Sequence, residues 1–331
     1  GWQWIFYINI PLAALLAIVG VLVLPRGRKM GGWIDLPGAL LFGAFLTCLS
    51  LGVGAQSVDF NPSQSGSSSI VLNPRLLVAS VVFLALFLLV EMLTKKPVID
   101  VRQFRRPAYG AAGVLSFFVG VALIVALALI PNFFRIFQPT QGVYGGALPL
   151  LRMTLLIPVG AFIGGWLSTR FGCPLPAALG SILTAIGLFL MSQWPANVGS
   201  EQITLTTVIA GLGFGLSIAP ISTSALNSGK LGDEGIAASM VTILRMTGMM
   251  IGLSWLAPWG VARFKALFAA SGVAQNDFTA QFALIHQVFS ELFLVAAGIA
   301  LVSVIPALLL WRRPHVAADV EAQPVKSYAA L

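Results

Sequence analysis

Residues 109–130 read YGAAGVLSFFVGVALIVALALI, and this stretch determines the fold class. It contains no charged side chain and lacks the alternating polar residues of a membrane β-strand. At roughly 1.5 Å of rise per residue, a helix of this length spans a hydrocarbon core of roughly 30 Å. Only a helix satisfies its own backbone polar groups across so much lipid, so the stretch predicts a transmembrane helix.

Eight further apolar runs of similar length repeat this pattern along the chain. They cover residues 5–24, 36–54, 76–94, 146–166, 175–194, 203–226, 236–256 and 288–311. Charged residues make up 9% of the 331 residues, against about 25% in a soluble domain. The sequence therefore predicts an all-α integral membrane protein with nine transmembrane helices.

The basic residues predict the orientation of these helices. If the loop after the first run is cytoplasmic, 13 of the 19 basic residues fall in cytoplasmic segments, four fall outside, and Arg152 and Arg245 fall inside spans. This positive-inside bias predicts a multi-pass protein of the inner (plasma) membrane with a cytoplasmic C-terminus. The net charge of +8 then reflects topology and contact with membrane lipids, and we expect no nucleic-acid partner.

Few residues suit catalysis or metal binding. Cys48 and Cys173 are far apart in sequence and form no metal or redox motif. A membrane-embedded enzyme needs acids, histidines or cysteines that converge within the bilayer, and the predicted spans contain almost none. We expect neither a metal nor a cofactor, and no enzymatic activity. His286 and His315 fall outside the predicted spans, and the segment 257–287 is expected outside the membrane, with an amphipathic, interfacial part.

Four motifs carry a family resemblance. The opening GWQWIFYINIP, residues 1–11, resembles the start of span six in the fourteen-span drug/proton antiporters of the major facilitator superfamily, with Gln3 in place of an arginine. GLGFG at 211–215 resembles their Gly-rich span twelve, and RMTGMMIG at 245–252 resembles Arg-x-x-Gly-x-x-x-Gly of span thirteen. GWLSTRFG at 165–172 resembles the superfamily loop Gly-x-Leu-x-Asp-Arg-x-Gly, although Thr169 replaces its aspartate.

The resemblance implies a C-terminal fragment, spans six to fourteen, of a proton-coupled exporter of hydrophobic or amphipathic small molecules. Residues 1–30 would be the last helix of the N-terminal bundle, 31–106 a two-helix insertion, 107–313 the C-terminal six-helix bundle and 314–331 a cytoplasmic tail. The missing N-terminal half, a small-molecule substrate and protons would be its partners. The alternatives are a non-transporting remnant or scaffold and a major-facilitator exporter of one specific metabolite.

Candidate site residues follow from position and chemistry. Substrate-cavity candidates are Phe117, Phe118, Arg152 and Arg245. Conformational and packing candidates are Gly160, Gly164, Pro158, Gly211, Gly215, Pro220, Gly248 and Gly252, which form Gly-x-x-x-Gly pairs or lie beside them. The loop motif supplies Gly165, Arg170 and Gly172.

The two arginine candidates also have plainer, structural interpretations. A charge at mid-bilayer costs at least about 2.5–3.5 kcal/mol, so Arg245 should face a cavity or a fixed interhelical partner. Arg152 lies near an outer end, where its side chain can extend to the headgroups.

The orientation can be tested in a chain whose two native cysteines have been replaced. A single cysteine at Ser67, expected outside, should react with an impermeant thiol reagent on intact cells, whereas one at Gln103, expected inside, should react only after lysis. Labelling of Gln103→Cys before Ser67→Cys would reverse the predicted orientation.

Overall fold

The computed structural model describes residues 3, 7, 9–23, 36–52, 73–94, 106–228, 234–271 and 277–310. The chain divides into two compact units, Gly1–Ile34 and Asp35–Leu331. Within the described residues all regular structure is helical, and none of them lies in a β-strand. The predicted all-α fold is therefore confirmed.

Every predicted apolar run coincides with a described helix. The helices are α2 (Asn9–Val23), α3 (Leu36–Gly52), α4 (Pro74–Leu93), α5 (Pro107–Phe137), η3 (Pro139–Gln141), α6 (Gly142–Phe171), α7 (Pro174–Ser192), α8 (Ser200–Ser228), α9 (Glu234–Ser271), α10 (Phe278–Val302) and α11 (Val304–Leu308). Seven helices in this part of the chain are long and apolar enough to cross a membrane, with α10 and α11 taken together. The described parts of α2 and α3 are shorter apolar helices.

Two helices extend into the segment that was predicted to lie outside the membrane. The segment 257–287 was expected outside the membrane, yet α9 continues through Pro258 to Ser271, and α10 begins at Phe278. At about 1.5 Å per residue the 38 residues of α9 reach about 57 Å, which exceeds the hydrocarbon thickness even with a strong tilt. The amphipathic pattern of 259–268 therefore belongs to the last turns of a continuous helix.

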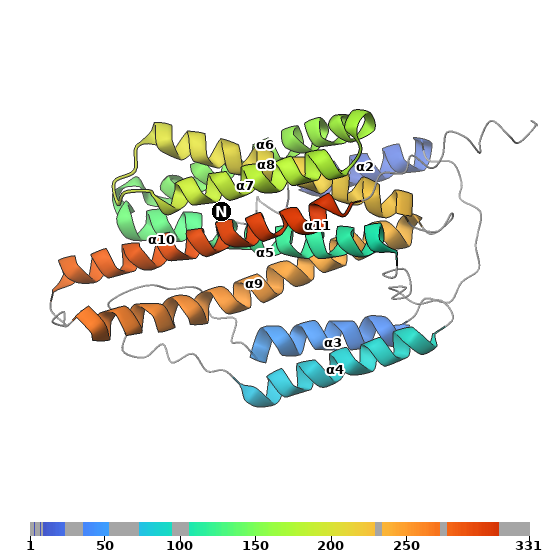
Figure 1. Ribbon diagram of the computed structural model, residues 1–331, viewed down its shortest axis with the longest axis horizontal. Helices are drawn as coiled ribbons and strands as arrows, with labels where there is room; N and C mark the ends of the chain where they lie inside the picture. The colour runs from blue at the N-terminus through green and yellow to red at the C-terminus, as the bar shows by residue number, and fades with distance from the viewer. Residues whose placement is uncertain are drawn as a thin grey trace, which may run out of the picture. The chain divides into compact units, whose positions relative to one another are not determined.

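The unit Gly1–Ile34 contains one described helix, α2. In the second unit, α3 and α4 form an antiparallel pair, which lies side by side in Figure 1. The backbone N–H of Asn73 donates to the carbonyl of Gly52 at 2.9 Å, so the end of α3 meets the start of α4. The rings of Phe42 and Phe87 are 5.1 Å apart between these helices.

Helices α5 to α11 pack as a bundle in which α8 contacts four neighbours, α5, α6, α7 and α9. The most extensive contacts join α6 to α8, α7 to α8 and α5 to α9, while α10 packs on α7, α5 and α9. One continuous cluster of buried apolar side chains connects these helices. The bundle, labelled in Figure 1, places all the candidate site residues on α5, α6, α8 and α9 or at the end of α6.

Glycine allows α6 and α8 to approach at backbone distance. A Cβ atom at Gly211 would lie 2.3 Å from the carbonyl oxygen of Met153, and one at Gly160 would lie 2.4 Å from that of Leu212. The contact at Gly215 is closer still, with 2.1 Å to the carbonyl oxygen of Ile157. Lipid tails are as apolar as leucine, so membrane helices associate through such close packing.

The prolines of α6 and α8 do not end their helices. Pro158 lies inside α6 and Pro220 inside α8, and each helix continues for at least eight further residues. Pro220 is buried, whereas Pro158 is exposed on the surface of the bundle. In membrane bundles, groups on neighbouring helices compensate for the backbone hydrogen bond that a proline removes.

Substitution at Gly215 tests the α6–α8 contact. Gly215→Ala should destabilise the bundle by about 1–3 kcal/mol, since its methyl group would collide with a backbone oxygen. Gly298→Ala is the matched control because no atom lies within 4 Å of a Cβ at that site. Thermal melting of the purified protein in detergent should show a lower midpoint for Gly215→Ala alone. Equal midpoints for the two variants would show that the contact contributes nothing to stability.

Candidate functional site

The contact between α5 and α9 brings three of the candidate residues together. A Cβ at Gly248 would lie 2.2 Å from the carbonyl oxygen of Phe117, and a Cβ at Gly120 would lie 2.1 Å from that of Arg245. One turn away, the hydroxyl of Ser116 donates to the carbonyl oxygen of Val241 at 2.7 Å. Phe117, Arg245 and Gly248 therefore lie along a single tightly packed contact, which we call the α5–α9 seam.

Gly252 extends the seam by one turn. A Cβ there would lie 3.0 Å from Cγ2 of Ile124 and 3.1 Å from Cγ1 of Val121. Phe118 is placed by a different contact, because its ring packs edge-on against that of Phe117, with centroids 5.8 Å apart. Both rings are half-buried. The seam thus carries a pair of partly accessible aromatic rings at the level of Arg245.

Arg245 occupies the seam through its backbone, while its side chain is half-buried. Among the residues that the structure describes, its guanidinium makes no hydrogen bond or ion pair. A membrane helix retains a charge where it meets a polar cavity or a partner. The guanidinium is therefore available to a group outside the described contacts.

Arg152 lies elsewhere in the bundle. Its Nη1 donates to the hydroxyl of Thr204 at 2.8 Å, which joins α6 to α8. That hydroxyl also donates to the carbonyl oxygen of Ser200, one turn back. Arg152 thus has a fixed interhelical partner, and it does not meet the α5–α9 seam.

The loop motif ends α6. Gly172 caps the helix with φ of 80°, a backbone conformation that favours glycine, and its N–H donates to the carbonyl oxygen of Ser168. The guanidinium of Arg170 stacks on the ring of Trp166, 4.5 Å from its centroid. Burial raises the pKa of the Cys173 thiol, and a hydrogen bond with Ser168 partly offsets the rise. At Gly165 a Cβ would meet only Ala219, at 3.9 Å.

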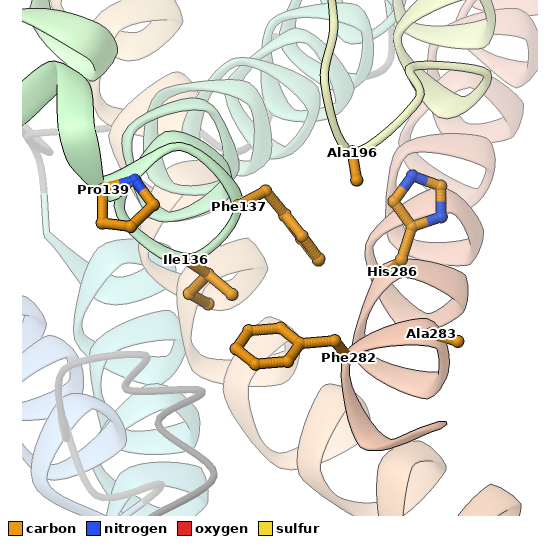
Figure 2. Close-up of a pocket in the computed structure, with 7 residues that line it drawn as sticks. All are labelled: Ile136, Phe137, Pro139, Ala196, Phe282, Ala283 and His286. Carbon is orange, nitrogen blue, oxygen red and sulfur yellow. The ribbon is translucent and has the colours of Figure 1, made fainter. Parts of the chain in front are cut away.

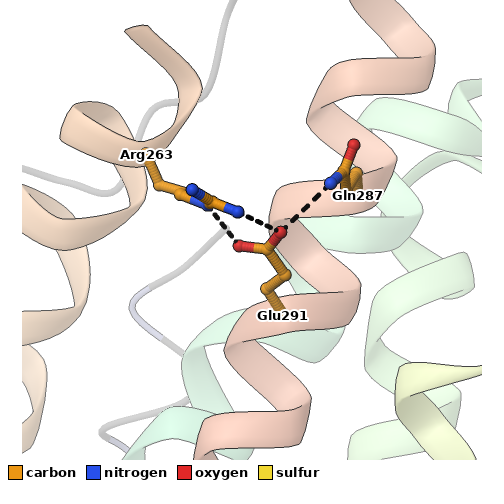
Figure 3. Close-up of polar contacts among 3 residues, drawn as sticks. All are labelled: Arg263, Gln287 and Glu291. Atoms are coloured by element: carbon orange, nitrogen blue, oxygen red, sulfur yellow. Dashed lines mark hydrogen bonds and ion pairs between the residues drawn. The ribbon is translucent and has the colours of Figure 1, made fainter. Parts of the chain in front are cut away.

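An ion pair that sequence reasoning missed connects α9 and α10. Nε of Arg263 lies 2.6 Å from Oε2 of Glu291, and Nη2 lies 2.9 Å from Oε1, so the contact is bidentate (Figure 3). Gln287 donates to the same carboxylate at 3.1 Å. The two charges lie 28 positions apart, and no sequence spacing indicates that two separate helices pair here.

A pocket of about 610 Å³ opens where α5 ends and α10 begins (Figure 2). Its lining residues come from α5, η3, the α7–α8 turn and α10: Ile136, Phe137, Pro139, Ala196, Phe282, Ala283 and His286. His286 was expected outside the last span, but it lies within α10, with Nε2 2.7 Å from the carbonyl oxygen of Trp194. No group of three or more His, Cys, Asp or Glu side chains is placed to hold a metal ion within the described residues.

The Arg263–Glu291 pair can be tested with a double-mutant cycle. Arg263→Gln and Glu291→Gln should each lower the melting midpoint, and the double variant should lose less than the sum, because either single change removes the same contact. Lys265→Gln, an exposed position on α9, is the control for loss of charge. Added salt should shrink the coupling, since the arginine is partly exposed. Strictly additive losses would show that the two charges act independently.

Comparisons with known proteins identify relatives of this chain that are named as transporters. No family model matches the sequence. The triacylglyceride transporter of Mycolicibacterium hassiacum is 30% identical over 350 aligned residues, which cover 95% of this chain and 63% of the relative. The triacylglyceride transporter of Mycobacteroides abscessus is 34% identical over 284 residues, which cover 82% of this chain and 54% of the relative. The chain thus spans about half to three-fifths of the length of these relatives.

A solved structure shares the fold. A bacterial homolog of the human lysosomal transporter Spinster, in an inward-facing and occupied conformation, superposes with a TM-score of 0.52. The match covers 83% of this chain and 68% of that structure at 14% sequence identity, so it bears on fold alone. The chain therefore shares the helical fold of a major-facilitator transporter.

Proposed function

We propose that these residues form part of a major-facilitator exporter of the inner (plasma) membrane, which moves hydrophobic or amphipathic small molecules outward in exchange for protons. The relatives named as triacylglyceride transporters support transport, and they favour lipids as one substrate class. The shared fold supports alternating access between two helix bundles. The N-terminal half of the longer relatives would supply the second bundle.

The observation that carries this proposal is the half-buried guanidinium of Arg245 beside the α5–α9 seam, which has no partner among the described residues. A purely structural arginine in a lipid-embedded bundle is expected to donate to a partner within the bundle, as Arg152 donates to Thr204. Arg245 instead lies where α9 touches α5 through backbone atoms. We infer that it meets the central cavity or a carboxylate of the second bundle in one of the transport states.

The seam also suits a change of packing. Gly120 and Gly248 bring the helix backbones into contact, so few long side chains interlock between them near Arg245. Smooth contacts of this kind offer little resistance when one helix shifts along another. Phe117 and Phe118 would present apolar surface to a hydrophobic substrate at the same level.

A second candidate is an exporter dedicated to one lipid class. The relatives' shared name favours it over a general drug exporter. The two differ in substrate breadth, because a dedicated site rejects ligands that lack its preferred chains. A membrane remnant or scaffold without transport is the remaining alternative.

Efflux by the full-length protein in proteoliposomes tests the proposal. With an imposed proton gradient, the parental protein should export a hydrophobic dye or a fluorescent triacylglyceride, and dissipating the gradient should stop export. Arg245→Ala should reduce export at least about tenfold at normal expression, as removing one group of a charge-dependent step costs on the order of 1.4 kcal/mol or more. Arg245→Lys should recover only part of the rate.

Lys265→Ala, an exposed cation on the same helix, is the control and should export at the parental rate. Gradient-independent leakage by the parental protein, or full export by Arg245→Leu, would contradict the proposal.

A further inference from the structure

The pocket at the end of α5 offers almost no polar group to a ligand. Six of its seven lining residues are Ile, Phe, Pro or Ala, and the seventh is His286. Nε2 of that histidine lies 2.7 Å from the carbonyl oxygen of Trp194. A carbonyl only accepts, so Nε2 must carry the hydrogen and donate it there. The lining includes no Asp, Glu, Lys or Arg.

Nearby polar side chains also form hydrogen bonds with the backbone of the α7–α8 turn. Nε2 of Gln138 lies 3.3 Å from the carbonyl oxygens of both Ala196 and Val198. The hydroxyl of Ser290 donates to the carbonyl oxygen of Ser192 at 2.5 Å. These side chains donate to backbone carbonyl oxygens of the turn, and the pocket surface is mostly apolar.

Aromatic packing holds the pocket in shape. The ring of Phe137 lies 5.4 Å from that of His286 and 6.4 Å from that of Phe282, centroid to centroid. Behind Phe137, Phe133 packs at 4.8 Å and against Trp194 at 5.4 Å. Figure 2 shows the side chains of Phe137, Phe282 and Ile136 turned toward one another. Because the buried rings of Phe133 and Trp194 support Phe137 from behind, this wall of the pocket is formed before a ligand arrives.

The mouth of the pocket continues onto apolar surface. Phe282 is 40% exposed, and Phe278, one turn earlier on α10, is 62% exposed. A ligand longer than the pocket would therefore leave its remainder on an apolar surface. A volume of about 610 Å³ suits an organic ligand, but polar ligands need convergent polar groups to orient them.

We propose that this pocket binds one aliphatic chain of a lipid. Binding itself does not depend on the proposed function, but a role in transport does. In transport, the pocket would hold one chain of a multi-chain substrate at the end of the bundle where α5 ends. An aliphatic chain fits because it needs no hydrogen bond in the pocket, and for a chain transferred from water each buried methylene strengthens binding about fourfold.

Photolabelling tests the binding site directly. The full-length protein in nanodiscs would be irradiated with a saturated fatty acid that carries a diazirine near its chain end, and peptide mass spectrometry would locate the adducts. We expect adducts concentrated on residues 136–139 and 282–286. Unlabelled straight-chain acids should compete more strongly as the chain lengthens.

Two variants fill the pocket from an exposed position, which limits the risk of misfolding. Ala283→Trp should lower labelling at these residues at least about tenfold, and Ala283→Leu should lower it less. Leu294→Ala, at an exposed position on α10 away from the pocket and its mouth, should label like the parental protein. Uniform labelling along all lipid-facing helices, or labelling unaffected by Ala283→Trp, would overturn the assignment.

Efflux by the same variants in proteoliposomes separates this inference from the proposed function. If the parental protein is labelled in the pocket but exports nothing, the pocket stands and the transporter proposal fails. If it exports a triacylglyceride while Ala283→Trp exports and labels equally well, the transporter proposal stands and the pocket assignment fails.

Discussion

Backbone contact between α6 and α8 is the constraint on which the bundle depends. At Gly211 and Gly215 the carbonyl oxygens of α6 lie where any other residue would place its Cβ. Because α8 also packs on α5, α7 and α9, its position fixes those of its neighbours. In lipid, the hydrophobic effect does not drive helices together. Close packing of the helix backbones takes the place of the apolar burial that stabilises the cores of soluble proteins.

The two halves of α9 contact different helices. Its first half forms the α5–α9 seam and carries Arg245, whose side chain has no described partner. Its second half runs past the hydrocarbon core and is tied to α10 by Arg263 and Glu291. The seam and the Arg263–Glu291 pair therefore share one helix, Glu234–Ser271, with Pro258 between them.

Hydropathy predicts which segments are helical because lipid admits little else. Residues 109–130 lie inside α5 for this reason. The same signal fails at helix ends, where polar residues such as Asn132 and Arg135 continue the helix without raising hydropathy. It also says nothing about which helices touch. Gly248 and Phe117 were each candidates from sequence, yet their meeting at one seam depends on helix pairing, as does the clamp between Arg263 and Glu291.

The turn between α7 and α8 is recognised through its backbone. Side chains of Ser290, His286 and Gln138 bind every second carbonyl oxygen from residue 192 to residue 198. Carbonyl groups are common to all residues, so most identities in this turn are free to drift during evolution. Its length is not free, because one inserted residue would move each later oxygen out of step with its donor. Homologous turns should therefore vary in composition while keeping a constant number of residues.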